Sequence, residues 1–583
     1  MTQLPRPEYP RPQFRRDDWL NLNGTWTYVF DFGKSGHQRD FRNASGFADG
    51  PYGGEIMVPF APESALSGVA HTDFIEAMWY HRRLEVPVDW NGRRILLHFG
   101  AVDYECEAFI DGISVGRHWG GTVAFSFDIT AQVTPGSTHD LVLFVRDEVR
   151  SGEQPGGKQS AAFRSHGCLY TRTTGIWQTV WMEAVSEFGL MDVQIVPDLD
   201  GSRFVVVPIF RALKPGLRFR ALLKAGDIVV DRAESVATTG VPAVLAVQAP
   251  RPWSPEDPFL YDLTFEVVDD ESVLDTVEAY AGLRKVHVDG NQIFLNNEPI
   301  YLRLVLDQGF YPDGIWTAPS DEALKRDIQL SMRAGFNGAR LHQKVFEPRF
   351  HYWADQLGYL TWGESSSWGI DVTDPVSARN FLSEWREIVI RDRNHPSIIT
   401  WTPFNETRGG AGHPQHARLH IDAYDLTHDL DPTRPVNDAS GYAHVKTDIW
   451  TVHNYTQDPE LLSDILKPRE DTGVWRNVPE FEVAYQGQPY IVDEFGGIKW
   501  IPREDLVFAE DSWGYGEAPQ SLEEFYTRLE GLVDVLLDYD HICGYCYTQL
   551  TDIEQEQNGI YNYDRTEKFD IDRIATIFTK SRE

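Results

Sequence analysis

The spacing of apolar residues changes twice along this chain, and the changes divide it into three regions. In residues 1–183, short strand-like runs such as 104–110 and 140–145 are separated by turn signals. Asp111-Gly112, directly after the first of these runs, supplies the positive φ angles that a tight hairpin turn requires. We therefore predict an antiparallel β-sandwich of jelly-roll type for residues 1–183.

Residues 184–281 continue the strand pattern in a shorter unit. Apolar and β-branched residues recur in the runs 204–207, 217–222 and 261–267, and Pro and Gly residues lie between these runs. About 100 residues of short strands with such turns are typical of an immunoglobulin-like β-sandwich. We predict this fold for residues 184–281.

From residue 282 the pattern changes to a strand followed by a helix, repeated. Ser320 can cap one helix and Gly335 can end it. The apolar residues of this helix, Leu324, Ile328 and Met332, recur at four-residue spacing. We predict eight strands, at residues 299–305, 336–340, 358–362, 398–404, 434–438, 449–453, 489–493 and 542–548. Eight strands that alternate with helices over about 300 residues predict a complete (β/α)₈ barrel for residues 282–583.

The net charge of the chain limits which kinds of molecule are expected to bind to it. The 583 residues include 53 Lys and Arg against 88 Asp and Glu, which gives a formal charge of −35. Such a charge disfavours binding to nucleic acid and to anionic membranes, and it disfavours acidic substrates unless a local basic site is present. We predict neither nucleic acid nor membrane among the partners.

Targeting signals and the number of cysteines indicate the cellular compartment in which the protein is expected. The N-terminal residues contain no apolar core of a secretory signal, and no apolar run approaches the ~20 residues of a membrane span. Four cysteines, Cys106, Cys168, Cys543 and Cys546, are too few for a disulfide framework. Cys543 and Cys546 lie in a strand-like run with side chains on opposite faces, so we interpret them as separate packing residues. These features predict a soluble protein of the reducing cytoplasm.

Two short apolar runs each end on a glutamate. Residues 397–406 end at Glu406, and residues 489–494 end at Glu494. A buried parallel strand is nearly continuous in apolar residues, so a charge at its carboxyl end needs a reason. Active sites of β/α barrels lie at that end, and two carboxylates facing one cleft are the groups that hydrolyse glycosides. The pair predicts a glycosidase; the alternative, a non-catalytic carbohydrate-binding protein, would have no need of both carboxylates.

The sequence around both glutamates resembles the family 2 glycoside hydrolases, the family of β-galactosidase, β-glucuronidase and β-mannosidase. Residues 394–406 resemble the strand that carries the acid/base in this family, and 490–497 resemble its nucleophile strand. Residues 175–183 resemble the close of its sugar-binding sandwich, 251–261 its second sandwich, and 282–284 its entry to the barrel. The resemblance covers nearly the whole chain in the right order.

The resemblance implies a retaining double displacement. Glu494 attacks the anomeric carbon, while a protonated Glu406 gives its proton to the leaving oxygen and later acts as a base toward water. The two carboxyl groups are then expected about 5–5.5 Å apart. The resemblance also implies that Asn405 binds the sugar 2-hydroxyl and that Tyr455 steadies the nucleophile.

Further residues are predicted to bind the substrate. Arg340 and His342 fall where family members have an Arg and a Ser-His pair, although the pattern here is Leu-His-Gln. Asp307 ends the first barrel strand, and Glu364 ends the third, where it contacts substrate or pairs with Arg340. The predicted set also includes His453, Trp500, Tyr547 and Gln549.

Two departures from the family bear on cofactor and substrate. Magnesium-using relatives have a Glu and a His just after the third strand, where this chain has Glu364-Ser-Ser-Ser-Trp368, so we predict no metal and no cofactor. Relatives that act on glucuronides carry an Asn-x-Lys after the eighth strand, where residues 549–558 contain three acids and no lysine. We predict an exo-acting enzyme that releases a terminal neutral sugar, with β-galactosides first and α-L-arabinopyranosides second.

Several alternatives stay open at the level of sequence. A β-glucuronidase-like or β-mannosidase-like hydrolase is the alternative within the enzyme class. The expected partner is an oligosaccharide or glycoside, and a homo-oligomer stays open. Residues 152–158 have P-loop spacing, but Gln159 follows where Ser or Thr would bind magnesium, and sandwich strands flank them. We interpret them as a surface loop that at most leans over the barrel mouth.

Overall fold

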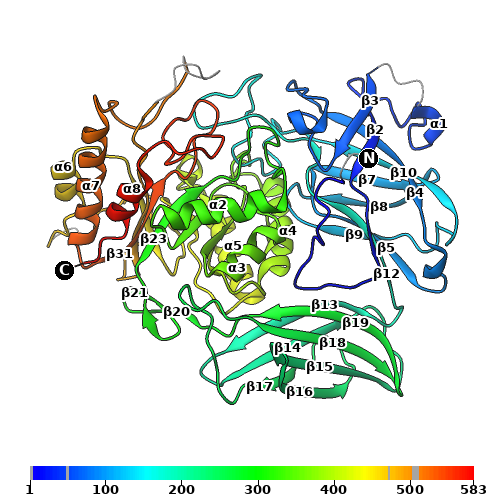
Figure 1. Cartoon of the computed structure of the whole chain (residues 1–583). Coiled ribbons are helices and arrows are strands. Elements are labelled where there is room, and N and C mark those ends of the chain that lie inside the picture. The colour runs from blue at the N-terminus through cyan, green and yellow to red at the C-terminus, as the bar shows by residue number, and fades with distance from the viewer. Residues whose placement is uncertain (1–3, 48–51, 471–472, 502–510, 583) are drawn as a thin grey trace.

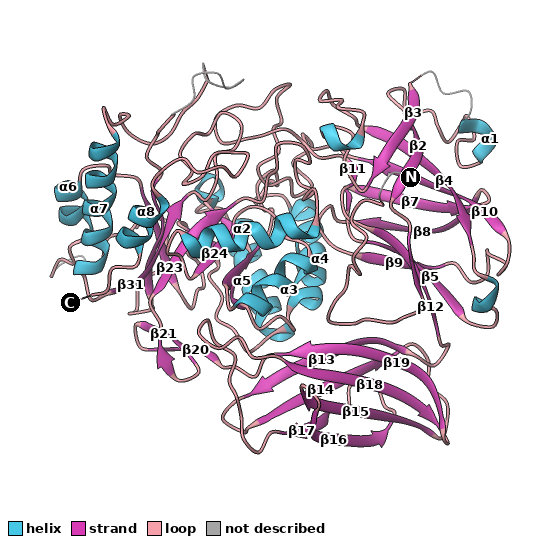
Figure 2. Ribbon diagram, viewed as in Figure 1, coloured by secondary structure: helices cyan, strands magenta, loops and turns pink. Residues whose placement is uncertain are grey.

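A computed structural model of the chain describes residues 4–47, 52–470, 473–501 and 511–582. Two regions built of strands are followed by a third in which strands and helices alternate (Figure 1). Figure 2 shows most helices gathered around the sheet of this third region. The predicted fold class, two β-sandwiches followed by a (β/α)₈ barrel, is confirmed. None of the helices among these residues is long and apolar enough to cross a membrane.

The first region packs two antiparallel sheets, in the orders β1-β12-β5-β9 and β3-β2-β4-β10-β7-β8, with a small sheet β11-β6. The strands are β1 Trp19–Asn21, β2 Gly24–Phe30, β3 Gly53–Val58, β4 Ala77–Glu85, β5 Arg94–Phe99, β6 Val102–Asp103, β7 Glu105–Ile110, β8 Ile113–Trp119, β9 Phe125–Asp128, β10 Thr138–Arg146, β11 Gly175–Ile176 and β12 Val180–Val185. The short helices are α1 Ala44–Phe47, η1 Ala65–Ser67 and η2 Val88–Trp90. Asp111 and Gly112 join β7 to β8 with φ of 48° and 77°, which confirms the predicted hairpin.

The second region packs the sheet β13-β14-β17 against the sheet β16-β15-β18-β19, and a small sheet β20-β21-β22 leads into the barrel. The strands are β13 Leu190–Asp198, β14 Arg203–Phe210, β15 Leu217–Ala225, β16 Ile228–Val236, β17 Ala243–Ala246, β18 Tyr261–Asp269, β19 Ser272–Ala281, β20 Val286–Asp289, β21 Gln292–Leu295 and β22 Glu298–Pro299. The predicted domain limits, 1–183, 184–281 and 282–583, stay predictions.

The third region contains a parallel sheet in the order β26-β25-β24-β23-β31-β30-β29. Its strands are β23 Leu302–Asp307, β24 Gly338–Leu341, β25 Leu360–Glu364, β26 Ile398–Thr402, β29 Trp450–Asn454, β30 Tyr490–Gly496 and β31 Ile542–Thr548, all within a few residues of their predicted positions. The predicted strand 434–438 is reduced to a bridge between Val436 and Trp401, followed by the pair β27 Phe404–Asn405 and β28 Ala439–Ser440. Pro435 explains the reduction, because it has no N–H to donate to a ladder.

The helices of the barrel pack on the outside of its sheet (Figure 2). They are α2 Asp321–Arg333, α3 Pro348–Leu357, α4 Pro375–Asp392, α5 Pro414–Leu430, α6 Pro459–Leu466, α7 Leu522–Asp538, α8 Ile571–Phe578 and the 3₁₀ helix η3 Thr407–Gly410. The predicted cap is confirmed, because Ser320 accepts a hydrogen bond from the N–H of Ala323. Leu324 and Ile328 are buried, but Met332 is 39% exposed. Eight residues of helix rotate Met332 about 80° away from Leu324, which takes it off the buried face.

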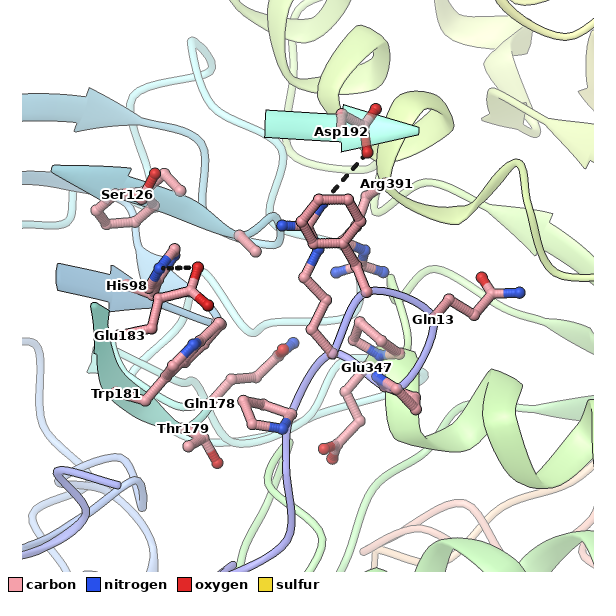
Figure 3. A pocket seen from close by; sticks show the side chains of 18 of the residues that line it. Gln13, His98, Ser126, Gln178, Thr179, Trp181, Glu183, Asp192, Glu347 and Arg391 are labelled. Atoms are coloured by element: carbon pink, nitrogen blue, oxygen red, sulfur yellow. Dashed lines mark hydrogen bonds and ion pairs between the residues drawn. The ribbon is translucent and has the colours of Figure 1, made fainter. Parts of the chain in front are cut away.

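A cavity of about 400 Å³ lies where the N-terminal segment, the first sandwich and the barrel meet. Figure 3 shows part of its wall, with labelled side chains that include Gln13, His98, Trp181 and Glu347. Arg16 at this junction forms buried ion pairs with Glu183 of β12 (3.3 Å) and Asp275 of β19 (2.8 Å). These ion pairs join the two sandwiches. Neither predicted catalytic glutamate lines this cavity.

Candidate active site

The two glutamates of the sequence motifs meet at the carboxyl ends of the barrel strands. Glu494 belongs to β30, and Glu406 follows β27 directly before the 3₁₀ helix η3. One side-chain atom from each of Glu406, His453 and Glu494 lies within 4.8 Å of the others. The side chain of Glu494 is 7% exposed and that of Glu406 is 22% exposed. A ligand therefore reaches the pair more readily from the side of Glu406.

Arg340 and Tyr455 contact different oxygens of Glu494. Nη2 of Arg340 donates to Oε1 of Glu494 at 2.6 Å, and the Tyr455 hydroxyl donates to Oε2. Arg340 also forms ion pairs with Asp493 (3.2 Å) and Glu364 (3.0 Å), and its side chain is fully buried. The guanidinium therefore places a positive charge beside all three carboxyl groups. Arg340, predicted to bind substrate, lies beneath the site with no exposed surface.

His453 lies between the two glutamates. Its Nδ1 is 2.6 Å from Oε1 of Glu406 and 3.2 Å from Oε2 of Glu494. Burial raises the pKa of Glu406, but the hydrogen bond and charge of His453 outweigh burial and lower it. Burial lowers the pKa of His453, but the charges of Glu494 and Asp493 outweigh burial and raise it to about 10. One proton is therefore held at the contact between His453 and Glu406, and in the free protein it resides on the imidazole.

The same three side chains form the group that, within the described ranges, comes close enough together to hold a metal ion. In this arrangement Nδ1 of His453 faces Glu406, while its Nε2 is 3.0 Å from Ser440 Oγ and 3.3 Å from Asp493 Oδ1. A protonated imidazole donates from both nitrogens and has no lone pair for a metal. The geometry therefore fits a hydrogen-bonded ion pair rather than a metal site.

The backbone at Glu406 is left-handed, with φ 52° and ψ 54°. This conformation is uncommon outside glycine, and where the surrounding structure enforces it, it often marks a functional residue. Here the N–H of Glu406 donates to the Ser440 carbonyl at 3.0 Å, and its carboxylate accepts a hydrogen bond from Tyr442. The strand pair β27–β28 therefore fixes the direction in which the carboxylate points.

Asn405 offers a donor that has no partner among the residues the structure describes. Its Oδ1 accepts from Nη2 of Arg340 at 3.3 Å, while its Nδ2 is buried without a hydrogen bond. Its backbone carbonyl accepts from Nε1 of Trp368 at 3.0 Å, which fixes the segment. A buried amide N–H without a partner costs free energy until a ligand or water accepts from it. The predicted contact with a sugar hydroxyl therefore has a suitable donor.

His342 and Glu364 form a buried cluster with Arg340 next to Glu494. Nδ1 of His342 lies 2.5 Å from Nη2 of Arg340 and 3.1 Å from Oε1 of Glu364. Burial lowers the pKa of His342 well below its usual value, so the ring is neutral. Burial raises the pKa of Glu364 to about 8, although Arg340 opposes the shift. Of the two roles foreseen for Glu364, the structure contains the ion pair with Arg340.

Three residues of the predicted substrate-binding set make their contacts elsewhere. Asp307 accepts the N–H of Gly309 at 2.9 Å, and the charges that act on it belong to Asp327, Arg565 and Lys344. Trp500 faces Phe525 of α7, with ring centroids 6.5 Å apart. Tyr547 packs between Phe495 and Phe578, on the helix side of β31. Side chains point alternately to the two faces of a strand, so the neighbouring residue Thr548 faces the site, 3.1 Å from the Tyr455 hydroxyl, while Tyr547 faces the helices.

Gln549 belongs to a closed ring of hydrogen bonds beside the site. Gln308 donates to Gln549 (2.7 Å) and to the Tyr170 hydroxyl (3.0 Å), and Gln549 donates to Asn558 (2.9 Å). Tyr170 (2.5 Å) and Asn558 (3.0 Å) in turn donate to the two oxygens of Glu556. The ring connects Tyr170 of the first sandwich with the loops after the first and eighth barrel strands, and it orients Glu556.

The interpretation of residues 152–158 as a surface loop is wrong for 154–158, which are buried at the barrel mouth. The N–H of Gly156 donates to the Trp368 carbonyl (2.7 Å), and the N–H of Gly157 donates to the Ser366 carbonyl (3.1 Å). Gly157 has φ +57°, and a Cβ there would lie 2.2 Å from the carbonyl oxygen of Gln343. The glycines therefore allow two backbones to approach closely, and they bring the next residue, Lys158, to the site.

Sequence reasoning missed several residues of the site. Tyr442 bonds Glu406, Thr548 Oγ1 lies 3.1 Å from the Tyr455 hydroxyl, and Ser440 contacts Arg340. These residues are ordinary polar side chains in segments without a motif, so only the fold identifies them. For Lys158 one signal was available, since two consecutive glycines before it indicate a close backbone approach.

Two family models match the chain. The model described as Glycosyl hydrolases family 2 matches residues 214–284. The model described as Glycosyl hydrolases family 2, TIM barrel domain, matches residues 286–497, which include both Glu406 and Glu494.

Relatives differ in name and in length. A β-galactosidase from Thermoanaerobacter pseudethanolicus is 23% identical over 464 residues, which cover 77% of this chain and 57% of that protein. A β-glucuronidase from Paenibacillus borealis is 24% identical over 596 residues, which cover 94% of each. This chain covers only 36% of a β-galactosidase from Aeromonas hydrophila, at 28% identity. A solved β-glucuronidase from Ruminococcus gnavus, in complex with N1-substituted uronic isofagomine, shares the fold with a TM-score of 0.80 at 20% identity, covering 98% of this chain and 100% of that one.

Proposed function

We propose that this chain is a family 2 glycosyl hydrolase, an exo-acting enzyme that retains configuration; its matches to two models of that family and its relatives named β-galactosidase and β-glucuronidase support the proposal. Glu494 is the nucleophile and Glu406 the acid/base. The short separation of their side chains supports this assignment, because an inverting enzyme needs its carboxyl groups ~6.5–9.5 Å apart to admit a water. The docked loop at residues 154–158 closes one side of the barrel mouth, which supports action on a chain end.

In the proposed first step, Glu494 attacks the anomeric carbon and the leaving oxygen takes a proton from Glu406. Arg340 donates to one oxygen of the nucleophile, and Tyr455 donates to the other. The free Nδ2 of Asn405 is available to the sugar 2-hydroxyl, a hydrogen bond that strengthens as the ring gains oxocarbenium character. In the second step Glu406, now a base, activates water for attack on the glycosyl-enzyme bond.

The preferred sugar in this proposal is neutral, a terminal β-galactoside first and an α-L-arabinopyranoside second. The first two cations after the eighth strand have other partners, since Arg565 pairs with Asp327 (3.0 Å) and Lys568 with Asp552 (2.6 Å). Glu556 lies in the stretch 549–558, where relatives that act on glucuronides carry a lysine. An unpaired buried ion costs several kcal/mol, so a glucuronide is disfavoured there.

A β-glucuronidase-like activity is the second candidate, and one observation favours it. Lys158 enters the site from the first sandwich, so a local basic group is present that the sequence around the eighth strand does not reveal. The whole protein's substrates, a homo-oligomer and a cytoplasmic location stay predictions.

The test is a panel of nitrophenyl glycosides, measured as kcat/KM with and without chelator. We expect β-galactoside or α-L-arabinopyranoside to exceed β-glucuronide by at least ~100-fold, equivalent to about 2.7 kcal/mol, and chelator to have little effect. Glu494→Gln should lose turnover by several powers of ten, and a fluorosugar should label Glu494. If the glucuronide is the best substrate, the sugar assignment is wrong; if the label lands on Glu406, the roles are wrong.

A further inference from the structure

Lys158 is a buried cation at the mouth of the barrel. It is only 6% exposed, and its ammonium nitrogen lies 3.8 Å from the centre of the Trp368 ring. Its charge lowers the pKa of Glu406 and that of Glu556, in both cases against the larger effect of burial, which raises it. The carbonyl of Lys158 accepts from the N–H of Tyr170 (2.7 Å), and the Tyr170 hydroxyl donates to Glu556 (2.5 Å), so Lys158 of the first sandwich lies near Glu556 of the barrel.

The ammonium group of Lys158 has no carboxylate partner among the residues that the structure describes. The contact with Trp368 is a cation–π interaction, which leaves the three N–H donors of the ammonium available. A buried cation that is neither paired nor hydrogen-bonded is costly. The ammonium group of Lys158 is therefore free to donate to a polar group of a bound ligand.

Glu556 is the matching acceptor on the opposite loop. It is 2% exposed, and each of its oxygens accepts one hydrogen bond, from Tyr170 and from Asn558. A carboxylate has about four acceptor positions, so roughly two remain free. Lys158 and Glu556 attract each other but do not form an ion pair. Lys158 thus offers free donors and Glu556 free acceptor positions, and we call the space between these two groups the polar gap.

Adjacent hydroxyl groups of a sugar fit such a gap, because each hydroxyl both donates and accepts. One hydroxyl accepts from the ammonium and its neighbour donates to the carboxylate, so both buried charges gain a partner while the ligand stays neutral. A carboxylate in the same gap would meet the charge of Glu556. We propose that Lys158 and Glu556 are specificity-determining residues that together bind neighbouring hydroxyls of the terminal sugar. This rests on the proposed function, and it assigns part of the sugar recognition to the loop at residues 154–158 of the first sandwich.

The test compares Lys158→Met with the parent on a set of monodeoxy sugars. On the complete nitrophenyl glycoside, kcat/KM should fall by about 10- to 100-fold, the effect of a hydrogen bond to a charged group. On the one analogue that lacks the contacted hydroxyl, parent and variant should agree within about twofold. Lys34→Met is the control, because Lys34 is a half-exposed lysine of the same sandwich, paired with Glu76 and Glu148, and it should behave as the parent on every sugar.

Glu556→Gln removes the charged acceptor instead of the donor, and it keeps the proposal testable if Lys158→Met does not fold. It should reveal the neighbouring hydroxyl by the same comparison. The proposal is overturned if either folded variant loses the same factor on every analogue, as a structural defect would, or if Lys158→Met matches Lys34→Met throughout. A loss confined to the glucuronide also overturns it, in favour of carboxylate recognition. If instead the parent hydrolyses no neutral glycoside, the proposed function itself fails.

Discussion

His453 contacts Glu406 and faces Glu494, so its protonation decides how charge is distributed over the two carboxylates. A general acid must carry a proton, yet the pKa of Glu406 is held low by the imidazolium beside it. The two observations agree if His453 and Glu406 share one proton. We predict that the proton moves to Glu406 when the sugar binds, because the sugar would separate the imidazolium from Glu494.

We expect His453→Asn to move the alkaline limb of the pH profile to lower pH. The pKa of His453 is raised to about 10, so the parent pair keeps its proton until the pH approaches that value. Without the imidazole, the proton is lost as the pH rises through the pKa of a buried carboxyl group. The measurement is kcat/KM against pH on a phenyl glycoside, because this parameter reports the free enzyme. An unchanged alkaline limb would show that His453 does not hold the proton.

Glu406→Gly should separate the acid/base from the nucleophile. Glycine is chosen because it tolerates the left-handed backbone at this position. Turnover of a phenyl glycoside should fall by about 10²–10⁴-fold, the usual effect of a general acid. A dinitrophenyl glycoside should still react with Glu494, and azide should then rescue the second step with retained configuration. An azide product of inverted configuration would contradict the assigned roles.

At the scale of elements, the sequence predicts strands and helices well where local chemistry decides them. The hairpin turn at Asp111-Gly112 and the cap at Ser320 follow from side-chain and backbone preferences alone, and both are confirmed. The fifth barrel strand was overestimated, because Pro435 interrupts the ladder there. The glycine-rich loop lies at the barrel mouth, as one alternative foresaw, but its burial was not predicted, because its contacts with Ser366 and Trp368 join residues about 200 positions apart in sequence, which no local pattern encodes.

Two glycines of that loop give a matched pair of variants. Gly157 and Gly152 both have positive φ, but a Cβ at Gly157 would lie 2.2 Å from the Gln343 carbonyl, whereas at Gly152 the nearest atom is 3.9 Å away. Gly152→Ala should therefore cost only the backbone strain, about 1–2 kcal/mol. Gly157→Ala should destabilise the protein more and lower kcat/KM, because the loop must withdraw from the barrel. Equal activity of both variants would show that loop docking is not needed for catalysis.

At the scale of the whole molecule, Arg16 ties the sandwiches together. Arg16→Met leaves Glu183 and Asp275 buried without their cation, which should cost about 3–5 kcal/mol. Arg15→Met is the control, because Arg15 is half exposed and its ion pairs are long, at 3.9 Å. Thermal and urea unfolding should show a clear loss for Arg16→Met and almost none for Arg15→Met. Similar losses in both variants would contradict a special role of the junction.

The same junction predicts a dependence of stability on acid. Burial raises the pKa of Glu183, but the hydrogen bond and charge of His98, together with Arg16, outweigh burial and lower it to about 2. A carboxylate with a lowered pKa stabilises the fold above its unfolded-state pKa, and this stabilisation is lost as the pH falls toward about 2. The acid-induced loss of stability between about pH 4.5 and pH 2 should therefore be smaller in Glu183→Gln, measured by unfolding midpoints against pH.

How far the active site could be predicted depends on which part of the chain supplies each residue. Glu406, Glu494 and Asn405 lie within continuous strand motifs, so the sequence places them together. Lys158 and Tyr170 come from the first sandwich, and only the packing of that sandwich on the barrel brings them to the catalytic pair. Such contacts depend on three-dimensional docking, which a pattern of apolar positions does not describe.

Because the loop of the first sandwich docks at the barrel mouth, we expect catalysis to depend on domain assembly. A barrel produced alone would lose Lys158 and Tyr170 and would expose the carbonyl groups of Ser366 and Trp368 to water. Turnover should then report whether the sandwich is docked on the barrel. On gradual heating, enzymatic activity should disappear when the sandwich detaches, before the helices of the barrel melt.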